Sequence, residues 1–210
     1  MKCINSKKEK FLLYTSFATF CLFFTLTIYI YLNPSNAFDI KASLLLQSQK
    51  WAGFLQVTNA IISAPEFRLI YIILLAVFIL THRYKMLIFP IAALSSELLT
   101  NLIKNIIARP RPLPSVVKVT DHAYGFSYIS GHTLEYMLLF TFLGILSLNI
   151  PKIRTYKYVF SFVCFAFALI VGLGRVYVGV HWFTDIIGSY LLGISVFSIL
   201  YCRLGDVPPI

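Results

Sequence analysis

Residues 11–32 read FLLYTSFATFCLFFTLTIYIYL, an apolar run of 22 residues without a charged side chain. A transmembrane α-helix needs about 20 such residues, because the helix rises about 1.5 Å per residue and the hydrocarbon layer is about 30 Å thick. In the whole chain 59% of residues are hydrophobic and 12% are charged, against roughly 45–50% and about 25% in a soluble domain. A β-barrel would show short alternating segments instead of long apolar runs. The sequence therefore predicts an all-α membrane protein.

Six apolar segments predict a bundle of six transmembrane helices. Proline-containing segments end three of them, because proline disrupts helix interiors: Asn33-Pro34-Ser35-Asn36, Arg109-Pro110-Arg111-Pro112 and Pro151. No internal repeat or hydrophilic linker divides the chain, so residues 1–210 are expected to form one domain. The predicted spans are 11–32, 67–81, 86–108, 133–150, 158–173 and 182–201.

Residues 37–64, between the first two predicted spans, are too polar to cross the bilayer. Apolar residues such as Leu44, Trp51 and Phe54 lie there among polar ones, which indicates an amphipathic helix lying in the interface. The start of the chain resembles a signal peptide, with Ser35-Asn36-Ala37 as a cleavage site. However, its apolar run exceeds the 7–15 residues typical of a signal core, so we interpret it as a retained anchor.

The net charge of +10 comes from short clusters between apolar runs, which favours a membrane setting over nucleic-acid binding. With six spans, four clusters fall on one side, which the positive-inside rule makes cytoplasmic, together with both termini. These clusters are Lys2, Lys7, Lys8 and Lys10; Arg83 and Lys85; Lys152, Arg154 and Lys157; and Arg203. Residues 109–132 and 174–181 then face outward, although they carry Arg109, Arg111, Lys118 and Arg175. These outward cations require a separate explanation.

Phosphate binding would explain the outward cations. A phosphate monoester carries nearly two negative charges near pH 7, and phosphoryl transfer depends on positioning and neutralising them. Lys104, Arg111 and Arg175 could supply that charge, and Arg109 competes with Arg111 for the role. Ser130 and Gly131 precede an apolar helical run, so the Ser130 hydroxyl and free backbone N–H groups could form an anion site.

A nucleophile is suggested by His181 and Asp185, four residues apart on one face at the start of the last span. A carboxylate there can accept a hydrogen bond from one ring nitrogen and leave the other free to attack phosphorus. No cysteine lies near these residues, and the four cysteines have neither metal-ligand nor disulfide-framework spacing. The chain has no P-loop and no carboxylate cluster for Mg²⁺, so no metal or cofactor is expected.

These residues resemble the signature of the type 2 phosphatidic acid phosphatase superfamily, which reads K-x6-R-P, then P-S-G-H, then S-R-x5-H-x3-D. The matching segments are Lys104 to Pro112, Ile129-Ser130-Gly131-His132, and Gly174-Arg175 through His181 to Asp185. The order agrees, and the six-span layout extends the resemblance over most of the chain. Ile129 and Gly174 replace the proline and the serine of the pattern. We expect Ile129 to alter loop stiffness and Gly174 to remove a hydroxyl that could donate a hydrogen bond within the site, which weakens or alters catalysis.

The resemblance implies a role for each residue. His181 would form a phosphohistidine, Asp185 would orient it, and His132 would protonate the leaving alkoxide and then activate water. Family spacing selects Arg111 over Arg109 as the phosphate ligand. Outside the motifs, Glu97 is expected to face the bundle or a cavity, and Asp121 and His122 are expected to be solvated rather than catalytic.

The function implied is hydrolysis of a lipid phosphate or pyrophosphate at the outer face of a cytoplasmic membrane. Candidate substrates are undecaprenyl pyrophosphate, phosphatidylglycerophosphate and phosphatidic acid. The partners are then the substrate and the bilayer; the oligomeric state is not predicted. Two alternatives stay open: a phosphotransferase on the same scaffold, and a non-catalytic binding or transport relative.

Overall fold

A computed structural model describes residues 6–64, 68–150 and 156–204, and all regular elements within them are helical. The all-α prediction is therefore confirmed. The elements are α1 (Lys7–Leu32), α2 (Ala37–Ser48), η1 (Lys50–Gly53), α3 (Phe54–Ser63), α4 (Leu69–Leu80), η3 (Tyr84–Leu87), α5 (Ile88–Ile107), α6 (Gly131–Leu148), α7 (Tyr156–Tyr177) and α8 (Phe183–Leu204).

Within the part of the chain that the structure describes, five helical segments are long and apolar enough to cross a membrane: Lys7–Leu32, Tyr84–Ile107, Gly131–Leu148, Tyr156–Tyr177 and Phe183–Leu204. They correspond to five of the six predicted spans, with ends shifted by up to four residues. The sixth prediction, residues 67–81, contains only the 12-residue helix α4. At about 1.5 Å per residue this helix is shorter than the hydrocarbon layer, so the count of six full-length spans is not confirmed.

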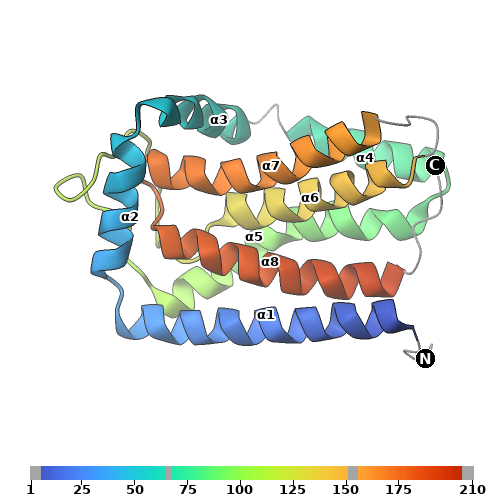
Figure 1. Cartoon of the computed structure of the whole chain (residues 1–210), viewed down its shortest axis with the longest axis horizontal. Helices are drawn as coiled ribbons and strands as arrows, with labels where there is room; N and C mark the ends of the chain where they lie inside the picture. Colours follow the sequence, from blue (N-terminus) through green and yellow to red (C-terminus); the bar gives the residue numbers. More distant parts are fainter. Residues whose placement is uncertain (1–5, 65–67, 151–155, 205–210) are drawn as a thin grey trace.

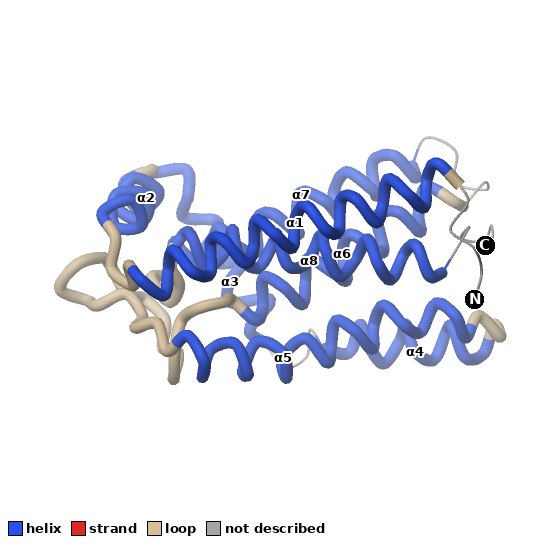
Figure 2. The backbone as a smooth tube through the Cα atoms, turned by 90° about the horizontal axis from the view of Figure 1, so that it is seen from below, coloured by secondary structure: helices blue, strands red, loops and turns tan. Residues whose placement is uncertain are grey.

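The long helices run along one axis, with α1 packed on α8 and α6 packed on both α5 and α7 (Figure 1). Helices α4 and α5 lie together on one side of this group (Figure 2). Aromatic rings join four helices at the centre: Phe89 of α5 stacks on Phe142 of α6 at 4.3 Å and lies 5.2 Å from Phe197 of α8, while Phe78 of α4 meets Phe142 at 5.9 Å. The core of the bundle therefore lies between α4, α5, α6 and α8.

Helix α1 is joined to the bundle by polar as well as apolar contacts. The hydroxyl of Ser16 bonds to the carbonyl of Ser195 at 3.0 Å, and the Ser195 hydroxyl bonds to the carbonyl of Ser16 at 3.0 Å. Small hydroxyl residues allow close approach and interhelical hydrogen bonds in membrane helices. Helix α1 therefore packs into the bundle, and its retention as an anchor stays a prediction.

Residues 37–64 form three short helices rather than one. Helix α2 lies across one end of the bundle, whereas α3 runs beside α7 (Figure 1). Asn36 caps α2, with its side chain accepting from the backbone N–H of Asp39 at 2.9 Å. Many apolar side chains of this segment are exposed, including Leu45 and Trp51. The interfacial position therefore remains a prediction, now for three helices.

The functional motifs gather at the α2 end of the bundle. Helix α5 stops at Ile107, where Ala108 adopts a left-handed conformation with φ 50° before two X-Pro steps. The long loop that follows lies at this end (Figure 2) and returns to α6, which Ser130 caps. Helix α7 continues past its predicted end at residue 173 to Tyr177, so Arg175 lies on a helix.

The opposite end of the bundle carries basic side chains that the sequence analysis predicted to lie together on the cytoplasmic side of the membrane. The Lys8 ammonium lies 4.9 Å from the ring centre of Tyr201, which places the start of α1 beside the end of α8. Lys85 and Arg203 line one cavity there. Of the predicted cytoplasmic clusters, Lys2, Lys152 and Arg154 lie outside the described residues.

Candidate active site

A polar cavity of about 350 Å³ lies at the α2 end of the bundle. Six of the eight predicted site residues line it: Lys104, Arg111, Gly131, His132, Arg175 and His181. They come from α5, the loop after it, α6, α7 and the turn before α8. Arg68, Asp121 and His122 also contribute to the wall. The cavity therefore brings residues of all three sequence motifs to one place.

Arg111 is held by carbonyl groups of the surrounding loops. Its Nη1 donates to Val180 O at 2.6 Å, its Nη2 to Tyr124 O at 2.9 Å and its Nε to Gly125 O at 3.0 Å. Burial lowers the pKa of Arg111, and the carboxylate of Asp185 opposes this shift. The three carbonyl partners of the guanidinium are neutral, so its charge is available to an anion in the cavity.

Arg175 is 5% exposed, and side chains of α3 accept hydrogen bonds from it. Its Nη1 donates to Asn59 Oδ1 at 2.6 Å and to Ser63 Oγ at 3.3 Å, and it lies 3.6 Å from a carboxylate oxygen of Asp121. Its Nε is buried and has no hydrogen-bond partner among the residues that the structure describes. A buried donor of this kind would gain a bond from an acceptor that entered the cavity.

His181 and Asp185 face each other as predicted. His181 Nδ1 lies 3.4 Å from Asp185 Oδ2, and His181 Nε2 lies 3.4 Å from Arg111 Nη1. Burial lowers the pKa of His181 to about 3, although Asp185 opposes the shift, so the ring is neutral near pH 7. One detail differs from the prediction: His181 precedes α8, and only Asp185 lies in its first turn. The backbone N–H of His181 instead donates to Arg175 O at 3.3 Å.

The catalytic-site prediction missed a buried ion network behind this pair. Arg109 is 1% exposed; its Nη1 donates to Asp185 Oδ1 at 2.5 Å and its Nη2 to Asp39 Oδ2 at 2.6 Å. Asp39 of α2 also accepts from the backbone N–H and the hydroxyl of Thr184 at 2.8 and 2.7 Å. Arg109 is thus paired with two buried carboxylates and does not line the cavity. A signal for Asp39 existed in the sequence: it is one of only 8 acidic residues and lies in an otherwise apolar helix turn.

Ser130 and His132 occupy different positions at the start of α6. Ser130 is fully buried, and its oxygen accepts from the backbone N–H and the hydroxyl of Thr133 at 3.4 and 2.9 Å. The hydroxyl therefore caps α6 and does not line the cavity, whereas Gly131 and His132 do. Gly131 and His132 begin the helix, and the backbone N–H groups of a helix start can bind an anion.

The two departures from the family pattern have separate structural settings. Ile129 is fully buried, and its peptide bond with Tyr128 is cis. A Cβ atom at Gly174 would meet the carbonyl oxygen of Leu55 in α3 at 3.2 Å. A side chain at Gly174 would therefore point toward α3, and the loss of a hydrogen-bonding hydroxyl from the site stays a prediction.

Two further expectations need correction. Glu97 does not face the bundle: its side chain is 63% exposed and pairs with Arg68 at 4.0 Å, because this face of α5 meets the start of α4. Asp121 is not merely solvated, since it accepts from Asn59 Nδ2 at 2.9 Å and pairs with Arg175. Burial raises the pKa of Asp121, but the bonds from Asn59 and the His122 N–H, together with Arg175, outweigh it and lower the pKa. His122 is exposed, as expected.

A bundle of span-length helices with a cationic cavity and a carboxylate-backed histidine at one end defines a class of integral membrane phosphatase. The chain belongs to the PAP2 superfamily, whose sequence model matches residues 85–207 and so includes every motif described above. It is a multi-pass membrane lipid phosphatase of this superfamily.

Individual relatives agree with this assignment. The chain is 26% identical over 195 residues to phosphatidylglycerophosphatase B of Bacillus subtilis, covering 90% of this chain and 94% of that protein. It is 31% identical over 113 residues to lipid phosphate phosphatase delta of Arabidopsis thaliana, covering 49% of this chain and 27% of that protein. The crystal structure of a transmembrane PAP2 type phosphatidylglycerolphosphate phosphatase from Bacillus subtilis superimposes with a TM-score of 0.70 at 26% identity, over 89% of this chain and 94% of that one.

Proposed function

We propose that the protein hydrolyses the phosphate or pyrophosphate headgroup of a membrane lipid through a phosphohistidine at His181. The observation that carries this proposal is the single cavity shared by the three cations of the sequence motifs, Lys104, Arg111 and Arg175, and two histidines, His132 and His181. Three positive charges suit a phosphate group with nearly two negative charges. The buried Nε of Arg175 supports the same occupant, because a phosphate oxygen would supply its missing acceptor.

The chemistry proceeds in two displacements. The Nε2 lone pair of His181 attacks phosphorus while the bond from phosphorus to the lipid oxygen breaks, and His132 gives a proton to that oxygen. Water then attacks the phosphohistidine, His132 accepts its proton, and the nitrogen–phosphorus bond breaks to release phosphate. Asp185 keeps Nδ1 hydrogen-bonded so that Nε2 carries the lone pair. The neutral state of His181 near pH 7 supports this role.

Among lipid phosphates, phosphatidylglycerophosphate is the first substrate to test, because the relative that matches nearly the full chain is a phosphatidylglycerophosphatase. Undecaprenyl pyrophosphate and phosphatidic acid are the other two candidates. A panel of the three lipids in mixed micelles, with free phosphate as the readout, ranks them by kcat/KM. Consumption of a lipid without free phosphate would instead indicate a phosphotransferase.

The nucleophile is tested with His181→Asn. We expect phosphate release to fall by at least about 10³-fold, since removing a nucleophile leaves only binding and electrostatic effects. His82→Asn is the matched control: His82 is exposed at the opposite end of the bundle, and asparagine tolerates its φ of 55°. Equal phosphate release from His181→Asn and wild type, for every lipid tried, would overturn the proposal.

Metal independence is a separate prediction. The cavity offers lysine and arginine cations for charge neutralisation, so we expect phosphate release to persist in EDTA. The measurement compares initial rates of detergent-solubilised protein with and without excess chelator. Complete loss on chelation, restored by a divalent cation, would contradict this part of the mechanism.

A further inference from the structure

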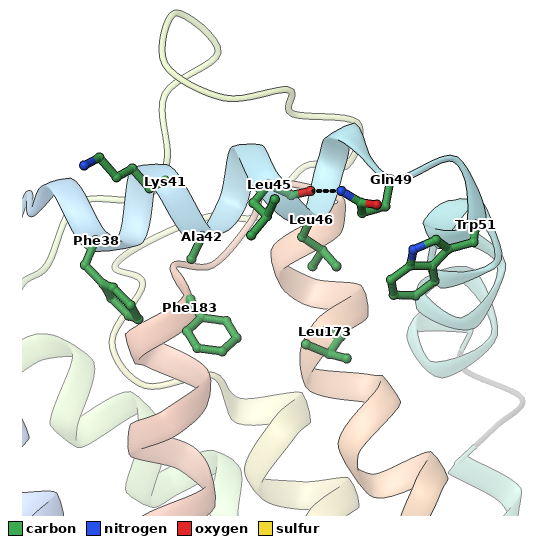
Figure 3. Close-up of a pocket in the computed structure, with 9 residues that line it drawn as sticks. All are labelled: Phe38, Lys41, Ala42, Leu45, Leu46, Gln49, Trp51, Leu173 and Phe183. Atoms are coloured by element: carbon green, nitrogen blue, oxygen red, sulfur yellow. Dashed lines mark hydrogen bonds between the residues drawn. The ribbon is translucent and has the colours of Figure 1, made fainter.

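A second hollow, of about 590 Å³, lies beneath α2 and is lined almost entirely by apolar side chains. Phe38 and Leu45 of α2 project toward the tips of α7 and α8, where Leu173 and Phe183 form the other wall, and Trp51 closes one side (Figure 3). We call this hollow the α2 groove. Its volume lies within the range of roughly 300–1,000 Å³ that is usual for ligand sites.

The α2 groove is distinct from the catalytic cavity, because the two share no lining residue. On α7, Leu173 lines the α2 groove whereas Arg175 lines the catalytic cavity. Likewise, Phe183 at the start of α8 lines the groove, whereas His181, just before α8, lines the catalytic cavity. The roof is fixed in place by Gln47 of α2, whose Nε2 donates to Lys118 O at 2.7 Å and to Tyr177 O at 2.9 Å.

The surroundings of the α2 groove change from apolar at its floor, along α7, to charged at its roof, on α2. Its floor continues along α7 through Leu169 and Phe162, which lie on the same helix face and are 57% and 72% exposed. In a membrane protein such a face contacts hydrocarbon. At the roof, the Lys41 ammonium points away from the apolar floor (Figure 3), and Trp51 is 60% exposed. Lysine and tryptophan in this arrangement are typical of the boundary between acyl chains and headgroups.

We propose that the α2 groove binds an acyl chain of an anionic bilayer phospholipid, whose phosphate pairs with Lys41. The chain would lie against Leu45, Leu173 and Phe183, and the headgroup would remain at the level of α2. A phospholipid matches both halves of the site, because it joins an apolar chain to a negative group near the interface. This lipid is a bound component of the bilayer and not the substrate, and the inference does not depend on the proposed hydrolysis.

Trp51 provides a direct readout, because it lines the groove and the chain has only 2 tryptophans. The full chain is reconstituted in phosphatidylcholine bilayers. In one series brominated phosphatidylglycerol is added in increasing fractions, and in a second series brominated phosphatidylcholine is added instead; in both, the bromine is on the acyl chains. Bromine quenches tryptophan on contact, and Trp51→Phe gives the contribution of Trp182 for subtraction. We expect brominated phosphatidylglycerol to quench Trp51 with about a fivefold lower half-saturating fraction, the factor that one lysine near an anionic headgroup supplies.

Three variants make the test specific. Lys41→Gln should remove the headgroup preference, while Lys10→Gln, the same change on an exposed lysine at the other end of the bundle, should retain it. Ala42→Phe, which fills the groove, should weaken quenching by both lipids, with circular dichroism as the check on folding. Equal quenching by both headgroups in wild type, or a preference that persists in Lys41→Gln, would overturn the proposal and leave only nonspecific lipid contact.

Discussion

Arg109 and Arg111 are two residues apart but differ in their surroundings: Arg109 pairs with carboxylates of the protein, whereas Arg111 lines the catalytic cavity. Arg109 is buried against the carboxylates of Asp39 and Asp185, so the protein itself compensates its charge. Arg111 donates to loop carbonyls and lines the catalytic cavity, so its charge remains for a ligand. The intervening Pro110 accepts a hydrogen bond from the Trp182 indole at 3.0 Å, which fixes the turn between them.

Arg109→Lys tests whether this network positions the catalytic pair. A lysine ammonium cannot reproduce the planar fork that reaches both Asp39 and Asp185, so Asp185 would lose its fixed orientation. We expect kcat to fall by at least about tenfold with KM changed less than about threefold, since no cavity cation is removed. Initial-rate kinetics on the best lipid of the panel measure both constants.

Arg203→Lys, at the far end of α8, is the control for the arginine-to-lysine change. Asp39→Asn, which removes the carboxylate charge that pairs with Arg109, should lower kcat in the same way. An increase in KM alone, or a loss of thermal stability with kcat intact, would show that Arg109 does not act through Asp185.

The pKa of His181 predicts how stability depends on pH. Burial lowers this pKa to about 3, whereas an unfolded histidine has a pKa of about 6.5. Between these values the unfolded chain binds a proton at this residue and the folded chain does not. The stability from the neutral ring is therefore complete above about pH 6.5 and is lost as the pH falls toward 3.

We expect the Tm of wild type to fall more steeply from pH 7 to pH 4 than the Tm of His181→Asn. Thermal unfolding in one detergent at several pH values measures the two slopes. Parallel slopes would mean that His181 binds protons equally in both states, contrary to its burial.

The motif residues could be predicted from sequence because their types and spacing reflect the chemistry of phosphate. The structure brings six of them to one cavity, while Ser130 lies behind it as a helix cap and Asp185 lies behind His181. Asp39 could not be placed in this way, because its partners Arg109 and Thr184 are distant in the sequence and meet it only through the packing of α2.

At the level of elements, hydropathy located the long helices but not the exact course of α2, α3 and α4. Apolar composition alone could not distinguish a 12-residue helix from a full span at residues 67–81. Nor could it show that α7 continues through Gly172 and Gly174 to Tyr177, because glycine often ends a helix. Here α3 packs directly against α7 at Gly174, and that contact depends on tertiary structure.

Gly174→Ser tests the contact between α3 and α7. The added side chain would meet Leu55 O at 3.2 Å, and α3 carries Asn59, which holds Arg175. We expect the family serine to destabilise this protein by about 1 kcal/mol, at the low end for overpacking, and to lower kcat/KM rather than raise it. Thermal unfolding and phosphate release measure the two effects.

Gly53→Ser is a suitable control, because a Cβ atom at Gly53 would meet nothing within 4 Å. Higher activity of Gly174→Ser at unchanged stability would support the interpretation that a serine hydroxyl belongs in the site.

For the whole molecule, we propose that the α2 end faces outward and that both termini are cytoplasmic. The described lysines and arginines at the opposite end, which include Lys7, Lys85 and Arg203, support this orientation through the positive-inside rule. In a chain with its cysteines replaced by serine, Tyr124→Cys reports the α2 end, since Tyr124 is 94% exposed, and Lys10→Cys reports the other.

In intact cells a membrane-impermeant maleimide should label Tyr124→Cys, whereas Lys10→Cys should react only after permeabilisation. The reverse pattern would place the catalytic cavity on the cytoplasmic side and refute the proposed localisation of the reaction.

The ion network at Arg109 also bears on how the enzyme matures. Thr184 and Asp39, which share two hydrogen bonds, are 145 residues apart, so they can meet only after the last helix has been synthesised and inserted. Until then, Arg109 lacks the carboxylate of Asp185, and the proposed nucleophile His181 lacks its orienting partner. The same late event thus completes the anchoring of α2 and the pairing of His181 with Asp185, so we expect a nascent chain, or one truncated before Thr184, to be inactive toward the lipids around it.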